Sequence, residues 1–341
     1  MSRPPAAHVL CADLLLGAAV AALCLYARQT LLLRLPCLDA DETGHALPAA
    51  RMALALASGN LRGFLDSTWR EVVWPPVHPW VVVPLFLGLG ISATAVRTVS
   101  LLALLAAAML VPPLTRRLAA EAAGREAPAI PATAGWIAVA ALLGAPLWHF
   151  WCTAMSEALG MLVTVAALYL EAGATPWPPR VRTSVLCGFL GALAFLTKYS
   201  YGFPLIGALV LAQAVRVPVR GHRPLLGVLA GCTVPLAAWA TFMLAPDWTR
   251  LREFVDVLVN RDEGLRGWEG LLFYPRVLAD WLGAAGAVIA ALGLTATVLR
   301  AGGRALAALL FLLLTLAQLM AHANKQSRYL IPALPVLLAL G

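Results

Sequence analysis

The sequence predicts an all-α polytopic membrane protein. Hydrophobic residues make up 61% of the 341 residues and charged residues only 12%, about half the charged fraction of an ordinary soluble domain. Apolar runs close to 20 residues long recur along most of the chain, and each can cross a hydrocarbon core of about 30 Å. The runs are continuous and rich in Leu and Ala, which favours helices over the alternating strands of a membrane barrel.

The apolar segments predict about ten transmembrane helices in a single domain over residues 1–341. Two longer polar stretches, 28–77 and 246–278, interrupt them. Because the last segment stops inside an apolar run at Gly341, we expect this chain to be truncated at its C-terminus. The segments are 9–27, 78–91, 95–115, 131–150, 154–171, 184–197, 201–215, 225–245, 279–299, 305–322 and 329–341.

Cations in the short loops predict the orientation. If 78–115 makes one net crossing, with 78–91 a partial or re-entrant helix, these cations fall on one side of the membrane, which the positive-inside rule assigns to the cytoplasm. The N-terminus is then cytoplasmic, and 28–77, with its juxtamembrane helices, faces outward from the plasma or inner membrane. The cations are Arg3, Arg116, Arg117, Arg180, Arg182, Arg216, Arg220, Arg223, Arg300 and Arg304.

The net charge of +8 has a membrane explanation. Its cations lie mostly in short loops, where they report topology and contact anionic lipid headgroups. The sequence contains no basic and aromatic platform of the kind that binds nucleic acid, so we expect membrane lipids and no nucleic acid as partners. The six cysteines are scattered without a CxxC pair, which indicates packing rather than zinc binding or disulfides.

The first outer loop opens with a cluster of acidic residues. Asp39, Asp41 and Glu42 precede His45, and the spacing of Asp41 and His45 puts both on one helix face. Capping of a helix over Thr43–Ser58 is one interpretation. The other is a general base for an acceptor hydroxyl or a site for a divalent cation, since three acids exceed what capping needs. His78, at the end of the same loop, should lie nearby.

Further charged residues lie on the same predicted face. Glu157 begins a helix after an outer turn, where it either caps that helix or serves a functional site. Lys198, Lys325 and Arg328 are outer cations against the positive-inside trend. They either snorkel to the interface or bind an anion, for which phosphate is the natural choice.

Three motifs resemble those of the GT-C glycosyltransferases, in the branch that contains protein O-mannosyltransferases and the lipid A aminoarabinose transferase. They keep their order over nearly the whole chain. The first outer loop carries Asp39-Ala-Asp-Glu-Thr-Gly-His45 and Pro76-Val-His-Pro79, the second motif is Leu196-Thr-Lys198 with Tyr201-Gly202, and the third runs from Lys325 to Tyr329 with Pro332 and Pro335.

The resemblance implies a GT-C-type helical bundle and an inverting sugar transfer at the outer leaflet. The donor would be a polyprenyl-phosphate sugar and the acceptor a glycan, lipid or protein of the cell envelope. The resemblance implies Asp41, Glu42 and Glu157 as catalytic residues, and we expect Asp39 of the same acidic cluster to act with them. It implies Lys198, Lys325 and Arg328 as ligands of the donor phosphate. We expect the neighbouring residues His45, His78, Tyr199, Tyr201 and Tyr329 to bind substrate as well. No cofactor is implied beyond the divalent cation considered for the acidic cluster.

The pattern also departs from the family. Val73 and Trp74 stand where aminoarabinose transferases have an acid and a lysine, so the resemblance does not extend to aminoarabinose specificity. A transporter and a non-catalytic membrane scaffold are the alternative functions. A transporter predicts internal repeats and charges at the midplane, whereas this sequence shows no half-to-half similarity and places its charges at one face.

Overall fold

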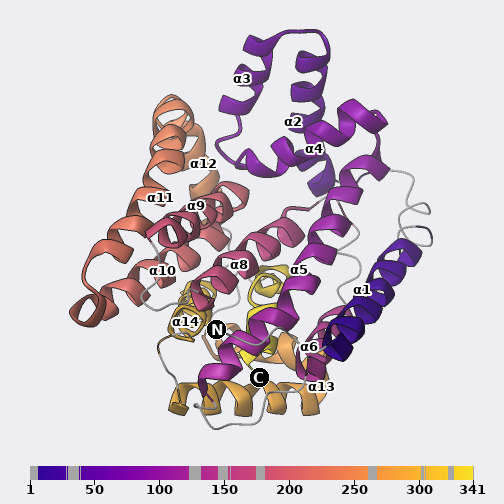
Figure 1. Cartoon of the computed structure of the whole chain (residues 1–341). Helices are drawn as coiled ribbons and strands as arrows, with labels where there is room; N and C mark the ends of the chain where they lie inside the picture. Colours follow the sequence, from indigo (N-terminus) through magenta and orange to yellow (C-terminus); the bar gives the residue numbers. More distant parts are fainter. Residues whose placement is uncertain are drawn as a thin grey trace.

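A computed structural model describes residues 7–27, 29, 38, 40–122, 132–144, 153, 155–173, 181–259, 267–300, 303, 305–321 and 326–340. All regular structure in these residues is helical (Figure 1). The helices are α1 (Ala7–Ala27), α2 (Ala40–Ala57), α3 (Leu61–Trp69), α4 (Val77–Leu89), α5 (Ala93–Ala122), α6 (Ala132–Gly144), α8 (Glu157–Ala172), α9 (Val181–Thr197), α10 (Tyr199–Arg220), α11 (Arg223–Trp239), the π-helix η2 (Ala240–Leu244), α12 (Trp248–Val259), α13 (Gly267–Arg300), α14 (Leu306–Ala321), the 3₁₀-helix η3 (Ser327–Leu330) and α15 (Leu334–Leu340).

The chain is a multi-pass membrane protein. Four described segments are long and apolar enough to cross a bilayer, namely 93–119, 199–219, 223–244 and 268–299. Four shorter apolar helices accompany them. Several helices extend beyond their predicted bounds, among them α5 and α10. The most informative shift is at α13, which begins at Gly267 inside the stretch expected to be polar. Gly283 adopts φ 69° within α13, a conformation open to glycine, and so divides that helix at a kink.

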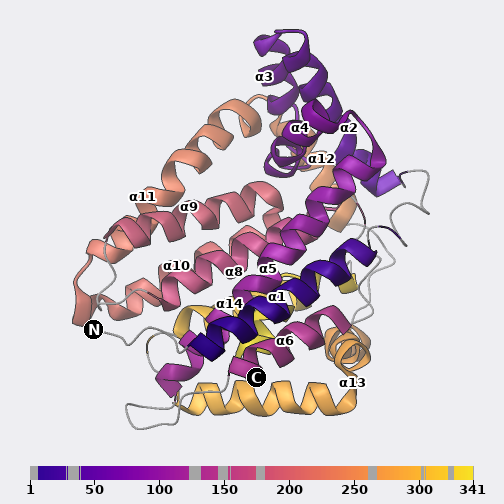
Figure 2. The same ribbon diagram turned by 45° about the vertical axis from the view of Figure 1, so that its right-hand side comes forward.

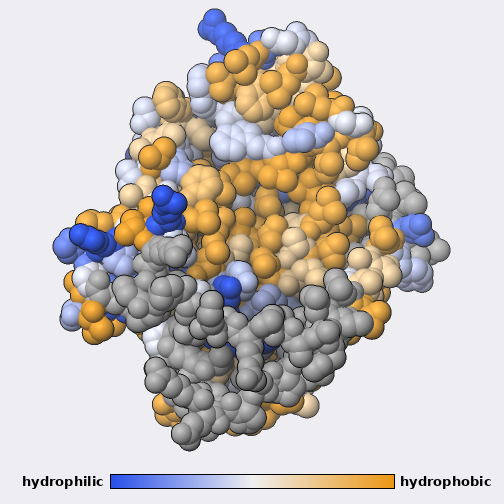
Figure 3. Space-filling view, viewed as in Figure 1, coloured by the Kyte–Doolittle hydropathy of each residue, from blue (hydrophilic) through white to orange (hydrophobic). Residues whose placement is uncertain are grey.

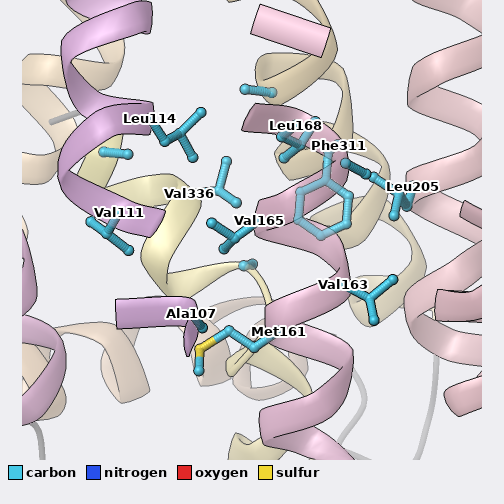
Figure 4. Close-up of a cluster of buried hydrophobic side chains, with 14 of the residues drawn as sticks. Ala107, Val111, Leu114, Met161, Val163, Val165, Leu168, Leu205, Phe311 and Val336 are labelled. Atoms are coloured by element: carbon cyan, nitrogen blue, oxygen red, sulfur yellow. The ribbon is translucent and has the colours of Figure 1, made fainter. Parts of the chain in front are cut away.

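The main hydrophobic core joins α5, α8, α10, α14 and α15. Figure 4 shows their side chains pointing toward one another between the helices. Because these five elements share one core, the two ends of α8 are held in fixed positions relative to the surrounding helices. The labelled core residues are Ala107, Val111, Leu114, Met161, Val163, Val165, Leu168, Leu205, Phe311 and Val336.

A second, smaller core joins α2 and α4 to the start of α5, and Phe64 of α3 packs against it. Helices α2, α3 and α4 gather at the top of the molecule in Figures 1 and 2. Met52 of α2 packs with Val82 and Phe86 of α4 there. Gly59, with φ 72°, follows the end of α2, and the side chain of Asn60 accepts a hydrogen bond from the Gly63 amide at the start of α3. The structure therefore confirms a helix in this loop, α2, and its end before Gly59.

The middle of the bundle has an apolar surface. Below the α2–α4 unit, hydrophobic residues cover most of the described middle of the face in Figure 3. Helix α13 lies at the far end from α3 in both ribbon views. The α2–α4 unit thus stands at one end of an apolar bundle, as expected for juxtamembrane helices.

Candidate active site

The candidate site is built around the first residue of α8. The Glu157 carboxylate is 1% exposed and accepts a hydrogen bond from Lys198 Nζ at 2.7 Å. Ser156, which precedes the helix, makes no capping hydrogen bond with its side chain. Glu157 thus forms an ion pair with a residue of the turn between α9 and α10, which a simple capping interpretation does not require.

Lys198 is positioned by a tight turn between α9 and α10. Its backbone is extended (φ −161°, ψ 127°), and its carbonyl accepts hydrogen bonds from the amides of Tyr201 and Gly202. A side chain at Gly202 would collide with the backbone of Phe195. Glycine therefore lets the two helices meet at this turn, and the Tyr201 ring packs directly on Gly160 of α8 in the same way.

Arg328 joins two carboxylates that lie far apart in the sequence. Its Nη1 donates to Asp41 Oδ2 at 2.8 Å, and its Nε lies 4.0 Å from Glu157 Oε1. The side chain of Gln326 orients it by accepting from Nε at 2.6 Å. The structure therefore brings Asp41, Glu157, Lys198 and Arg328 into one cluster, formed by α2, α8, the α9–α10 turn and η3.

Glu42 has a different environment from Asp41. Both Glu42 oxygens accept hydrogen bonds from Arg97 of α5, at 2.7 and 2.6 Å, and both side chains are buried. This bidentate pair fastens α2 to the start of α5. Sequence reasoning missed Arg97, although it is the only charged residue in the apolar run 95–115, and an ionisable residue in such a run is itself a signal.

Two histidines line the inner side of the cluster. The His45 ring lies edge-on to Trp74 and His78, with centroids 5.0 and 5.3 Å away. Burial lowers the pKa of His45 to about 4; the Glu157 and Asp41 carboxylates oppose this shift, and the Lys198 and Arg328 charges add to it. Burial therefore keeps His45 neutral at pH 7. A neutral imidazole offers no positive charge to an anion.

Tyrosines surround the lysine. The rings of Tyr201 and Tyr329 lie 5.4 and 5.1 Å from Lys198 Nζ, within the range of cation–π attraction. The Tyr199 hydroxyl donates to the Val72 carbonyl and accepts from Trp239 Nε1 at 3.2 Å. Tyr199 thereby ties the segment between α3 and α4 to α10 and α11, and sequence reasoning did not identify Trp239 as part of this network.

Two predicted site residues, Asp39 and Lys325, lie outside the described residues. Within the part of the chain that the structure describes, no group of three His, Cys, Asp or Glu side chains is arranged to hold a metal ion. The divalent cation expected at the acidic cluster therefore stays a prediction.

The four-residue cluster combines a fixed part with an exchangeable part. Glu157 is buried and anchors Lys198, whereas the Asp41 side chain is 52% exposed and reaches Arg328 through an exposed hydrogen bond. The Arg328 side chain is 17% exposed, so water reaches this pair from its Asp41 side. An anion that enters from that side can replace Asp41 as the partner of Arg328, which would release the Asp41 carboxylate to accept a proton.

Comparison with known proteins identifies the fold. Two crystal structures of ArnT from Cupriavidus metallidurans are similar to this chain, one bound to undecaprenyl phosphate (TM-score 0.68) and one in the apo state (TM-score 0.64). Each is 20% identical to this chain, and each alignment covers 95% of this chain and 58% of ArnT. The chain thus spans little more than half the length of ArnT.

The expected GT-C-type helical fold is confirmed by this likeness. At the level of sequence, no protein-family model and no curated protein matches the chain.

Proposed function

We propose that this protein is a membrane glycosyltransferase that transfers a sugar from a polyprenyl-phosphate donor to an acceptor at the outer face of the cell membrane. The observation that carries the proposal is the convergence of Asp41, Glu157, Lys198 and Arg328 at one end of the bundle. The fold supports it, since one of the similar ArnT structures holds undecaprenyl phosphate. In this proposal the N-terminus is cytoplasmic and the α2–α4 unit faces outward.

Lys198 and Arg328 are the proposed ligands of the donor phosphate, with Lys325 as a third. A polyprenyl phosphate keeps its chain in lipid and presents its anion at headgroup depth, so its site needs cations beside the bilayer. Arg328 can bind two phosphate oxygens at once, and Lys198 adds a point charge. Buried Glu157 holds Lys198 in place and lies 4.0 Å from Arg328, which makes Glu157 a positioning residue for the cations.

Asp41 is the proposed general base. When the donor phosphate occupies Arg328, the exposed Asp41 carboxylate is free to accept the proton of an acceptor hydroxyl. The hydroxyl oxygen forms a bond to the anomeric carbon, and the bond from that carbon to the phosphate oxygen breaks. Polyprenyl phosphate leaves with the bonding electron pair, and its extra charge is stabilised by Lys198 and Arg328. Attack from the opposite face inverts the anomeric configuration.

The other predicted residues have supporting roles in this proposal. The Glu42–Arg97 pair fixes the start of α2 and so orients Asp41, whereas His45, His78, Tyr199, Tyr201 and Tyr329 shape the surrounding wall. The acceptor is a glycan, lipid or protein of the cell envelope. A divalent cation beside Asp39 and Asp41 would supplement the general base in this proposal and would not replace it.

The decisive experiment measures sugar transfer by the purified chain from a panel of polyprenyl-phosphate sugars. Because the cations stabilise the leaving phosphate, Arg328→Ala should lower turnover at saturating donor rather than only raise the donor concentration needed. Lys198→Ala should act in the same direction. Arg252→Ala is the matched control, since that arginine is 72% exposed on α12 and pairs only weakly with Asp256. If turnover and donor dependence are unchanged in both Arg328→Ala and Lys198→Ala, these two residues do not bind the donor phosphate.

A further inference from the structure

A second candidate site lies where the end of α3 meets η2 and α12, apart from the ion-pair cluster. A cavity of ≈ 580 Å³ opens between the end of α3 and the connection from η2 to α12. None of the residues proposed for the transfer reaction lines it. The lining residues that matter are Asp66, Trp69, Arg70, Phe242, Asp247 and Arg250.

The walls of this cavity are joined by specific contacts. Arg250 Nη1 donates to the Arg70 carbonyl at 3.0 Å and lies 3.6 Å from Asp247 Oδ2. The rings of Trp69 and Phe242 are stacked, with centroids 5.8 Å apart and an interplanar angle of 20°. These contacts connect two segments about 180 residues apart in the sequence, so the two walls of the cavity are held together by tertiary contacts.

The helix that supplies Phe242 departs from regular α-helical geometry at this point. Residues 240–244 form the π-helix η2, which continues α11. Wide turns of this kind are rare, and they occur frequently at functional sites because they redirect the side chains that follow. Here the wide turn coincides with the residue that stacks on Trp69.

The chemistry of the lining selects one class of ligand. Two carboxylates and two guanidinium groups balance to zero charge, so a phosphate would meet as much repulsion as attraction. A lipid chain would have to desolvate four charged groups. A saccharide ring has an apolar face of C–H groups for the Trp69–Phe242 surface and a rim of hydroxyls that can both donate to carboxylates and accept from arginines.

We propose that this cavity binds a saccharide unit of the acceptor. The inference rests on the proposed function, because it gives the acceptor a carbohydrate part. The cavity is also connected to the transfer site: Arg70 lies two residues before Val72, whose carbonyl accepts the hydrogen bond of Tyr199, the neighbour of Lys198. A saccharide held there would anchor the acceptor while another part of it reacts beside Asp41.

Saturation-transfer NMR on the full chain in lipid nanodiscs tests the assignment. Nanodiscs are needed because a maltoside detergent would itself present a saccharide. Maltose serves as the neutral probe and glucose 6-phosphate as the anionic one. The native chain should give saturation transfer to maltose and a weaker signal with glucose 6-phosphate. Trp69→Leu should weaken maltose binding about tenfold, as the loss of one aromatic face predicts.

Trp268→Leu is the matched control, because Trp268 is 78% exposed and lies outside the cavity; its maltose signal should equal that of the native chain. Equal thermal unfolding of the two variants will show that the effect of Trp69→Leu is local. The assignment is overturned if the native chain binds neither probe, if Trp69→Leu binds maltose as the native chain does, or if glucose 6-phosphate binds more tightly than maltose.

The two proposals fail separately. Maltose binding that depends on Trp69, in a chain that transfers no sugar from any polyprenyl-phosphate donor, would remove the proposed function and support the saccharide site. Sugar transfer without maltose binding at this cavity would support the proposed function and remove the saccharide site.

Discussion

The two ends of α8 carry carboxylates in opposite circumstances. At its start, Glu157 holds Lys198 and faces Arg328, whose other partner is the half-exposed Asp41. Near its end, Glu171 accepts hydrogen bonds from Gln213 and Arg216 of α10, and all three side chains are buried. The first cluster has an open edge, whereas the second is enclosed by helices.

In the proposed function, this difference separates a reactive arrangement from a structural one. Breaking a buried ion pair leaves an uncompensated charge in a medium that solvates it poorly, so the Glu171 cluster is suited to fastening α8 to α10. Arg117 adds a further tie nearby, where its Nη1 donates to the Tyr169 carbonyl at 2.6 Å and its guanidinium lies 3.5 Å above the Tyr169 ring. The Asp41–Arg328 contact can exchange partners because water reaches it.

The largest expected effect belongs to the exposed carboxylate. Asp41→Asn removes the proposed base and should lower turnover by about 10²–10⁴-fold, with little change in thermal stability because the side chain is half exposed. Asp256→Asn is the control, since Asp256 is 61% exposed on α12. Sugar-transfer rates and unfolding midpoints of the two variants provide the measurement. If Asp41→Asn keeps native turnover, Asp41 is not the general base.

The enclosed end should respond in stability instead. Glu171→Ala strands the Arg216 charge among helices and should cost about 3–5 kcal/mol, seen as a lower yield of folded protein and a lower unfolding midpoint. Glu269→Ala changes the same residue type at an exposed position and should leave both unchanged. If Glu171→Ala is as stable as the native chain, the cluster does not fasten α8 to α10.

A pH effect on stability should arise at the reactive end. The pKa of His45 is about 4 in the folded chain against 6.5 when exposed, so the unfolded chain takes up a proton first as the pH falls. Stability is therefore lost between pH 6.5 and 4, by roughly 2–3 kcal/mol from this group.

The test compares unfolding midpoints across that range. His45→Gln should flatten the decline relative to the native chain, whereas His222→Gln, at an exposed position, should leave it as it is. A decline in His45→Gln as steep as in the native chain would mean that burial does not hold His45 neutral.

The smallest effect is expected where an ion pair is exposed on both sides. Arg62 and Asp66 lie 3.9 Å apart on α3, and the Arg62 side chain is 92% exposed. Arg62→Ala should change neither the unfolding midpoint nor turnover measurably. A clear loss in either would show that exposure alone does not distinguish the two ends of α8.

Local properties of the sequence determined the class of the protein and most helix positions. Hydropathy and length identify a membrane-spanning segment without knowledge of its neighbours, and the stop at Gly59 follows from the backbone conformation of a single residue. The sequence also indicated the charged residues that lie together at the α2–α4 end, because ionisable groups near apolar runs are few. It placed the start of α13 too late, since that helix begins in a polar stretch.

Tertiary structure alone decided which charges pair. Asp41 and Arg328 are 287 residues apart, and Glu42 turns away from that cluster to Arg97. Asp41 and Glu42 are adjacent acidic residues, and the sequence does not show which of them faces which partner. The rotation of α2 against α5 decides which side chain is buried. The cavity at Trp69 and Phe242 likewise exists only after α3 and η2 pack together. Pairing and enclosure depend on contacts between distant segments, which local sequence patterns do not encode.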